Sequence, residues 1–263
     1  MDSDFRVLEP MESETYRDYA RRVLFENIVN IHMPPGAVID EAEIAQRLGI
    51  SRTPVHEAVK SLSGAGLVDG EPSRATRVSR IDYRLISDGI FLRSCLEPNI
   101  IESLRGRLSS AQIQRLLDVL QVQRRAIDTQ DFYLYNSADD SFHYMLYEFA
   151  NCNVLIGLLR KQLVPFSRYR TLIYLLTSKY SYLGKSYVDH EKLFYTLTLS
   201  CDLPEPTPQF IKHHIMDGLK EFHKLFAMKE EYFTGFDSAT AISELEREIA
   251  EMNRIAFAPA VDQ

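Results

Sequence analysis

Hydrophobic and polar residues alternate along most of the chain with the period of an α-helix. In the first third of the chain, this period marks three segments, at about residues 15–29, 40–48 and 51–62. The apolar positions of the third segment fall at i, i+3, i+4 and i+7, so one face is apolar and the other stays polar. A tight turn, Gly49 to Ser51, comes just before it. Two short helices joined in this way predict a helix-turn-helix, whose second helix presents its first turn to the DNA major groove.

Two short strands are predicted directly after the third helix. Residues 67–69 and 76–79 have the pattern of strands, and a glycine and a proline lie in the turn between them. Three helices followed by a hairpin predict a winged helix over residues 15–80. The segment before it, residues 1–14, is acidic and lacks periodicity, so we expect it to be a mobile lead-in.

The remainder of the chain is predicted to be helical. Between residues 81 and 228 the helical period marks six segments that are long enough to pack as a bundle, at about residues 82–108, 111–129, 131–150, 153–179, 186–200 and 207–228. We expect Pro165 to kink the fourth of them. The C-terminal extension, residues 229–263, contains apolar residues at helical spacing between Ser238 and Ala256, which predicts one extra amphipathic helix. The predicted fold class is mainly α: a winged helix-turn-helix followed by an all-α six-helix bundle.

Composition and charge add one feature to this picture. The chain has 263 residues, 45% of them hydrophobic, which suits two modest domains. It has no apolar run approaching the roughly 18 residues of a membrane span and no signal peptide, so we expect no membrane contact and a cytoplasmic location. The net charge of -7 is unfavourable for DNA binding. Between residues 47 and 80, however, six basic residues outnumber three acidic ones, so the predicted winged helix is locally positive.

The polar face of the third segment carries the candidate DNA-binding residues. Arg52, Thr53 and His56 would face base edges or nearby phosphates, because a recognition helix places its first turn in the major groove. Lys60, further along the same face, and Arg74, at the tip of the wing, would mainly hold the phosphate backbone. Double-stranded DNA is therefore the first predicted partner.

Four titratable residues of the predicted bundle lie on the inward faces of three helices. Asp139 and His143 lie four residues apart on one shoulder of an apolar face, so they can share a ligand. His190 lies near the middle of another apolar face, and His214 lies at the edge of a third. One carboxylate and three imidazoles suit a divalent metal, zinc foremost or else nickel, manganese or iron, with positions left open for water or a ligand. Alternatively, Asp139 and His143 form only a local salt bridge, and the inward histidines bond backbone carbonyls.

Both halves of the chain resemble one known arrangement. Residues 51–58, with the pattern Ser-Arg-Thr-Pro-Val-x-Glu-Ala, resemble the SRTPVREAL signature of the GntR family of bacterial transcription regulators. His56 departs from this signature, which has an arginine at that position, and Ala75 replaces the glycine that usually follows the wing cation. The second half resembles the all-helical FCD ligand-sensing domain of the FadR subfamily, through the motifs Arg93-x-x-Leu96-Glu97, Asp139-x-x-Phe142-His143, Asp189-His190 and Ile211-x-x-His214-Ile215.

The resemblance implies a homodimer that binds a short palindromic operator. It also implies that the last three motifs carry the metal ligands and that the metal coordinates a small carboxylate effector. Arg93 is the candidate for meeting the effector's carboxylate, although it could instead only pair with Glu97 one helical turn further on. The exchange of arginine for His56 predicts DNA binding that is weaker and more dependent on pH than in a His56→Arg variant.

The sequence thus predicts a metabolite-responsive transcription regulator that is not an enzyme. One alternative is an enzyme that activates water or an oxidant on the bundle metal, with the first domain as an attachment module. That function requires an acid or base beside the metal, and no glutamate is clearly placed for it. Another alternative is a purely structural metal, or none, in a bundle that serves only for dimerisation.

Overall fold

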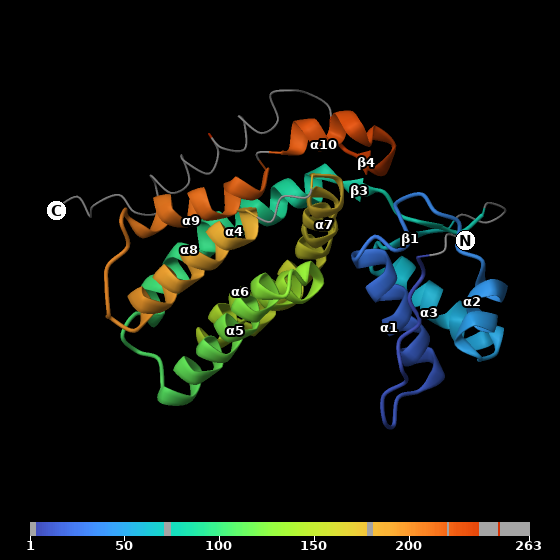
Figure 1. The fold of residues 1–263 in the computed structure, drawn as a ribbon, viewed down its shortest axis with the longest axis horizontal. Coiled ribbons are helices and arrows are strands. Elements are labelled where there is room, and N and C mark those ends of the chain that lie inside the picture. The colour runs from blue at the N-terminus through green and yellow to red at the C-terminus, as the bar shows by residue number, and fades with distance from the viewer. Residues whose placement is uncertain (1–3, 71–74, 178–180, 220, 237–246, 248–263) are drawn as a thin grey trace.

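Two helical units follow one another along the chain, as the computed structural model shows (Figure 1). The structure describes residues 4–70, 75–177, 181–219, 221–236 and 247. The prediction of a mainly helical fold, with a helix-turn-helix before a helical bundle, is confirmed. No helix within the described ranges has the length and apolarity that crossing a membrane requires.

The first unit is built on three helices, α1 (Tyr16–Val29), α2 (Glu41–Leu48) and α3 (Arg52–Gly64). The Asp40 side chain accepts hydrogen bonds from the backbone N–H groups of Ala42 and Glu43, which fixes the start of α2. Gly49 ends that helix with a φ of 66°, a left-handed conformation that glycine adopts without strain. The four apolar positions of α3 that the spacing predicted are buried, and α3 packs against α1: Val55, Ala58, Val59 and Leu62.

A short antiparallel hairpin follows α3, as the sequence predicted. It pairs β1 (Val68–Asp69) with β2 (Arg77–Val78), and Val68 lies opposite Val78. Both valines are buried, so the hairpin is held to the domain by its apolar face. The tip of the predicted wing, residues 71–74, lies outside the described residues, and Arg74 with it.

Six helices form the predicted bundle: α4 (Tyr83–Leu104), α5 (Ser110–Asp128), α6 (Phe132–Phe149), α7 (Asn153–Thr177), α8 (Ser181–Leu197) and α9 (Thr207–Met216). α4 is central, because α6, α7, α8 and α9 all pack against it. α5 covers α6 and α8. Side chains from α6, α8 and α9 can therefore converge although these helices are far apart in the sequence. α7 continues through Pro165, and the predicted kink stays a prediction.

The sixth predicted helix, residues 207–228, is interrupted. A 3-10 turn, η1 (Asp217–Leu219), separates α9 from α10 (Phe222–Met228). The carbonyl oxygen of Gly218 accepts a hydrogen bond from the hydroxyl of Tyr169 on α7 at 2.8 Å. This carbonyl is thus satisfied by a side chain, and glycine weakens a helix interior, so both features favour the break.

Two other helix ends differ from the prediction. α4 ends at Leu104, earlier than predicted, and Gly106 then adopts a φ of 68° and donates its N–H to the carbonyl of Leu197. α8 spans Ser181–Leu197, so it begins and ends earlier than residues 186–200. It stops where Leu199 takes a positive φ of 58°, which no helix can continue through.

Two strands of two residues each are present that the sequence did not predict. β3 (Ile81–Asp82) pairs in parallel with β4 (Phe233–Thr234), and a 3-10 turn, η2 (Glu230–Tyr232), leads into β4. Strands this short leave no period in the sequence. The start of the C-terminal extension is thereby tied to the start of the bundle, through the buried Phe233. The extra helix predicted between Ser238 and Ala256 falls outside the described residues, apart from residue 247.

The described part of the N-terminal segment differs from the predicted mobile lead-in. Phe5 is buried in the core of the first unit. The side chain of Asn27 on α1 accepts a hydrogen bond from the Arg6 N–H at 2.7 Å and donates one to the Arg6 carbonyl at 2.8 Å. Tyr19 donates its hydroxyl to the carbonyl of Leu8 at 2.8 Å. Residues 4–14 are therefore packed along α1, because a single aromatic side chain and a buried amide hold them there.

Candidate metal centre and DNA-reading helix

The first turns of α3 carry most of the predicted DNA-binding residues. Arg52, Thr53, His56 and Lys60 are all exposed, whereas the opposite face of the helix is buried. The helix thus presents one continuous polar surface to solvent. This is the arrangement that a recognition helix needs to reach base edges and phosphates.

His56 does not stand alone on this surface. Its Nδ1 lies 3.1 Å from Oε1 and 3.2 Å from Oε2 of Glu41, at the start of α2. The imidazole is 67% exposed, and the Glu41 side chain is 19% exposed. The carboxylate therefore orients the ring and brings a negative charge to the exposed face of α3, a contact that no pattern in the sequence indicates.

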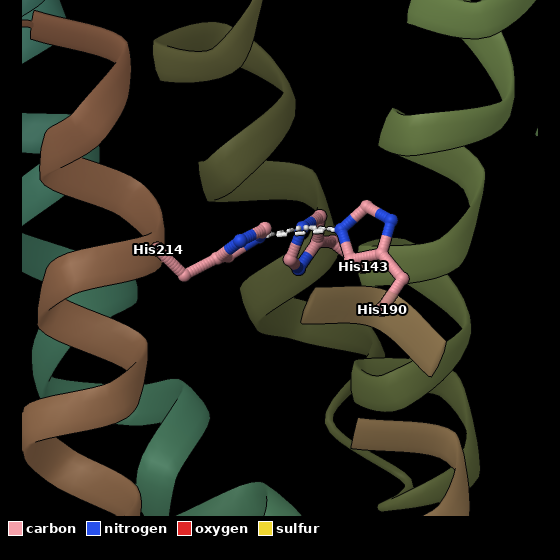
Figure 2. Close-up of side chains that lie close together, drawn as sticks. All are labelled: His143, His190 and His214. Atoms are coloured by element: carbon pink, nitrogen blue, oxygen red, sulfur yellow. Dashed lines mark hydrogen bonds between the residues drawn. The ribbon is translucent and has the colours of Figure 1, made fainter. Parts of the chain in front are cut away.

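Three buried histidines from three helices meet at one point (Figure 2). His143 on α6, His190 on α8 and His214 on α9 turn their Nε2 atoms toward one another. The Nε2 of His190 lies 3.2 Å from that of His143 and 3.2 Å from that of His214, and the third separation is 3.3 Å. We call this group the histidine triad. Of its imidazoles, none is more than 8% exposed.

The outward ring nitrogens of the triad each face an oxygen atom. Nδ1 of His190 lies 2.9 Å from Oε1 of Gln123, and Nδ1 of His143 lies 3.1 Å from Oε2 of Glu97. The Gln123 oxygen accepts a hydrogen bond, which places the ring proton of His190 on Nδ1, and the negative charge of Glu97 favours the same position for the ring proton of His143. Asp189 lies on the same side of His214, with Oδ2 3.5 Å from Nδ1. The three Nε2 atoms are then left with lone pairs that point at one another.

Three facing lone pairs repel each other unless a cation lies between them. Tetrahedral zinc binds imidazole nitrogens at about 2.0–2.1 Å, which places neighbouring nitrogens about 3.3 Å apart. The separations within the triad match this value. Oxygen partners on the far ring nitrogens are also what histidine metal ligands have in proteins. The donor set of the triad therefore fits a divalent metal ion.

Burial favours the form that binds metal in two members of the triad. It lowers the pKa of His190 well below its ordinary value and lowers that of His143 as well. The charge of Arg93 lowers the pKa of His143 further, and Glu97 opposes that change. The neutral imidazoles of His143 and His190 are thus favoured at neutral pH, as metal coordination requires.

Asp139, the fourth predicted ligand, lies beside the triad. Its Oδ1 is 3.7 Å from Nε2 of His190 and accepts a hydrogen bond from the Ser186 hydroxyl at 3.1 Å. Its Oδ2 pairs with the guanidinium of Arg170 on α7. Burial alone would raise the pKa of Asp139, but Arg170 first and then His190 outweigh it and hold that pKa well below its usual range. Asp139 therefore supplies a negative charge at the edge of the triad.

Arg93 pairs with Glu97, which is one of the two alternatives that the sequence allowed. Nε of Arg93 lies 2.6 Å from Oε1 of Glu97, and both side chains are buried. Glu97 thus joins Arg93 to His143 through its two oxygens. Nη2 of Arg93 is buried and finds no hydrogen-bond partner among the described residues. A guanidinium with a free donor near the triad can still receive a carboxylate.

Family models match both units of the chain. Residues 19–78 match the bacterial regulatory proteins of the gntR family, and residues 88–198 match the FCD domain. The chain belongs to the GntR family. The GntR match runs from within α1 to the end of β2, and the FCD match contains Arg93, Asp139, His143 and His190. His214 lies beyond the matched FCD range, and it enters the triad through α9.

Named relatives of this GntR chain are regulators. It is 27% identical to the HTH-type transcriptional repressor RspR of Escherichia coli (strain K12) over 154 residues, which cover 59% of this chain and 65% of RspR. It is 34% identical over 121 residues to an uncharacterized HTH-type transcriptional regulator of Streptomyces ambofaciens, which cover 46% of this chain and 50% of that protein. Each of these relatives is named as a transcription regulator, and the chain spans 65% or less of the length of either one.

The structure of E. coli McbR/YncC has a similar fold. It aligns with 82% of this GntR chain and 99% of its own chain, with a TM-score of 0.64 and 17% sequence identity. The likeness extends over both units of the chain. The winged helix and the helical bundle are thus combined in the same way in the two proteins.

Several residues around the triad were not recognised from the sequence. Gln123 and Ser186 lie on α5 and α8 at positions that have no motif, and Arg170 lies on α7. Glu97 had one usable signal, since it stands one helical turn from Arg93 and was considered only as its partner. Polar residues at inward positions of an amphipathic helix are the general signal for such partners.

Proposed function

We propose that this chain is a DNA-binding transcription regulator whose operator affinity depends on a divalent metal ion and a small carboxylate held in the helical bundle. The observation that carries the proposal is the histidine triad, which lies in the same chain as an exposed basic reading helix. RspR, a relative, is named as a repressor, which supports the first part. A protein that reads operator DNA works in the bacterial cytoplasm, and we place this one there.

On the DNA side, Arg52 and Thr53 are proposed to contact base edges at the start of α3. Lys60 would neutralise a phosphate further along the helix, and Arg74 would do so from the wing. Both DNA-binding units of a homodimer would be needed, since a palindromic operator presents two equal half-sites. His56, held by Glu41, would read or position with a weaker and less permanent charge than arginine.

On the sensing side, the triad would hold the metal, with Asp139 as the fourth ligand. Zinc suits three imidazoles and a carboxylate, and nickel, manganese or iron are also compatible. The metal would supply a positive charge and an open coordination position for a carboxylate oxygen. Arg93 would donate its free Nη2 to the second oxygen of the same carboxylate.

Binding of the effector would favour one orientation of the two reading helices over another. A ligand can do this only through its different affinity for the two arrangements, and such couplings are typically about 1–3 kcal/mol. The effect on DNA binding would then be about fivefold to about a hundredfold. Whether DNA binding rises or falls depends on which arrangement fits the operator.

The proposal is tested by measuring how tightly the protein binds its own upstream DNA. Fluorescence anisotropy titrations at moderate salt would compare the wild type, Arg52→Ala and the control Arg107→Ala, whose arginine is exposed on the bundle. We expect Arg52→Ala to lose about 1–3 kcal/mol of binding free energy and the control to lose none. Wild-type affinity in Arg52→Ala would contradict the role of α3.

The sensing half is tested with the same titration. Zinc and a panel of small mono-, di- and tricarboxylates would be added to the wild type and to His143→Ala. We expect at least one carboxylate to change the DNA affinity of the zinc-loaded wild type and to leave that of His143→Ala unchanged. If both proteins keep zinc and respond alike, the triad is not the sensor. Zinc binding without any carboxylate response would indicate a structural metal.

A further inference from the structure

A buried arginine joins the bundle to the winged helix. Arg168 on α7 is 1% exposed. Its Nη2 donates to the backbone carbonyl of Ser79 at 2.7 Å, and its Nη1 donates to the Ser79 hydroxyl oxygen at 3.3 Å. Ser79 lies between β2 and β3, in the segment where the chain passes from the first unit to the second. The guanidinium of Arg168 therefore holds the segment that connects the two units in place.

Ser79 also holds the end of the reading helix. Its hydroxyl donates to the carbonyl of Gly66 at 2.8 Å, and its N–H donates to the carbonyl of Leu67 at 3.0 Å. Gly66 and Leu67 follow directly after α3. One residue thus connects α7 of the bundle with the C-terminal end of the helix that carries Arg52.

The opposite face of α7 is tied to the histidine triad. Arg170 lies two residues after Arg168, about 200° around the helix, and pairs with Asp139 and Asp140 of α6. Ser167 adds a hydrogen bond from its hydroxyl to Oδ2 of Asp140 at 2.7 Å. Asp139 in turn lies 3.7 Å from Nε2 of His190. A shift of α7 relative to α6 would therefore change the contacts at the triad and also the contacts at Ser79.

The hydrogen bonds from Arg168 to Ser79 are easily broken, because their acceptors do not balance the positive charge of the guanidinium. Its two hydrogen-bond acceptors are uncharged, and its Nε has no hydrogen-bond partner among the described residues. Burial lowers the pKa of Arg168 to about 10, even though Asp69 opposes this change. A buried cation without a paired carboxylate is costly, so a small displacement can favour its release to water.

We propose that Arg168 is the positioning residue that transmits the state of the histidine triad to α3 through Ser79. The proposal rests on the function proposed above for the triad. Asp139 would divide its negative charge between Arg170 and a cation held by the triad, so occupancy of the triad changes the pairing of α6 with α7. Because α7 is one continuous helix, the change reaches Arg168 and then the end of α3.

A hydrogen-exchange experiment tests this link without metal. Exchange of the amide groups of residues 62–68 would be measured by mass spectrometry in the wild type, Asp139→Asn, Arg168→Met and the double variant. We expect each single variant to exchange at least about threefold faster than the wild type, and the double variant to exchange as fast as Arg168→Met alone. Arg168→Lys, which keeps a donor, should restore most of the response to Asp139→Asn. Effects that simply multiply in the double variant would overturn the proposal.

Two further variants keep the exchange experiment decisive. Ser167→Ala removes the hydroxyl that donates to Asp140 and accepts from Arg170, and it leaves both charges in place, so it replaces Asp139→Asn if that variant does not fold. Arg21→Met is the matched control, since Arg21 is exposed on α1 and lines the same cleft between the two units as Arg168. A faster exchange of residues 62–68 in Arg21→Met would show that loss of any arginine loosens α3, and would contradict the specific role of Arg168.

A DNA-binding arm separates this proposal from the proposed function. The ratio of operator affinities with and without zinc would be measured for the wild type and Arg168→Met, with zinc content determined for both. We expect Arg168→Met to keep its zinc and to bring the ratio to within about twofold of one. An unchanged ratio overturns the role of Arg168. If the wild type itself shows no zinc effect, the proposed function fails, and the hydrogen-exchange cycle still decides whether Arg168 couples the two units.

Discussion

The proposed recognition helix α3 and the histidine triad are built in opposite ways. α3 supplies Arg52, Thr53 and Lys60 from one short helix, and all of them are exposed. The triad takes its members from α6, α8 and α9, with His143 and His214 71 residues apart in the sequence, and buries them. Exposed residues act in water and nearly independently of one another, whereas buried polar residues act as a unit.

The two regions also differ in what a charge pair contributes. The Arg124–Asp128 pair on the surface of α5 has side chains that are 63% and 59% exposed, and solvent screens it. The Arg93–Glu97 pair next to the triad has the same i, i+4 spacing, but its side chains are 4% and 0% exposed. The same chemistry should therefore tolerate loss of a partner at one site and not at the other.

Removal of one member of the buried pair should have the largest effect. Glu97→Gln leaves Arg93 charged and buried without a counter-ion, and it removes the carboxylate that faces His143. We expect the free energy of unfolding to fall by about 3–5 kcal/mol. The matched change on the surface, Asp128→Asn, should alter it by less than about 1 kcal/mol. Urea denaturation followed by circular dichroism measures both, and equal losses would mean that the burial difference has no energetic consequence.

Metal binding should stabilise the protein only through the triad. At a free zinc concentration about a hundred times the dissociation constant, we expect about 2.7 kcal/mol of added stability, visible as a rise in the melting temperature. His143→Ala should lose this rise. His213→Ala is the matched control, since its imidazole is on the same helix as His214 but is 65% exposed and faces Glu205. A zinc-dependent rise that survives in His143→Ala but not in His213→Ala would move the metal site to the surface.

The zinc-free protein should lose stability as the pH falls below about 6.5. Burial lowers the pKa of His143 and His190, so the unfolded chain binds more protons than the folded one in this range. The depressed pKa values of Glu97 and Asp139 add a further loss only below about pH 4.5, where carboxylates of the unfolded chain become protonated. Denaturation in the presence of a chelator at pH 7.5, 6.5 and 5.5 measures how the free energy of unfolding changes with pH. His190→Ala should reduce this change. A pH dependence that is the same in this variant as in the wild type would contradict the role given to His190.

The sequence was most informative where one helix determines the result. The buried face of α3 follows from the spacing of Val55, Ala58, Val59 and Leu62 alone, and the inward positions of His143 and His190 follow from the faces of their own helices. Periodicity alone left the convergence of the histidines as one of two alternatives, because it does not say which helices are neighbours, and the resemblance favoured it. The break at Gly218 also depends on a neighbour, Tyr169 on α7.

Contacts between segments explain the remaining differences. Gln123 faces His190 because α5 packs against α8, and no local pattern marks it. Phe5 and Asn27 hold the N-terminal segment to α1, although its acidic composition suggested a mobile chain. Glu41 reaches His56 across the turn between α2 and α3, so the reading surface too has one feature that depends on packing.

The smallest predicted effect concerns His56. The charge of arginine is permanent, whereas that of histidine depends on pH between 6 and 8. We expect His56→Arg to bind operator DNA more tightly at pH 8, by about 0.2–1 kcal/mol, the range of one exposed charge pair, and the difference should shrink at pH 6. Glu41→Gln should raise the affinity of wild-type and variant proteins alike, because it removes a negative charge from the reading surface. Equal affinities of the wild type and His56→Arg at both pH values would mean that this position faces away from the phosphates, and that α3 reads DNA through its first turn alone.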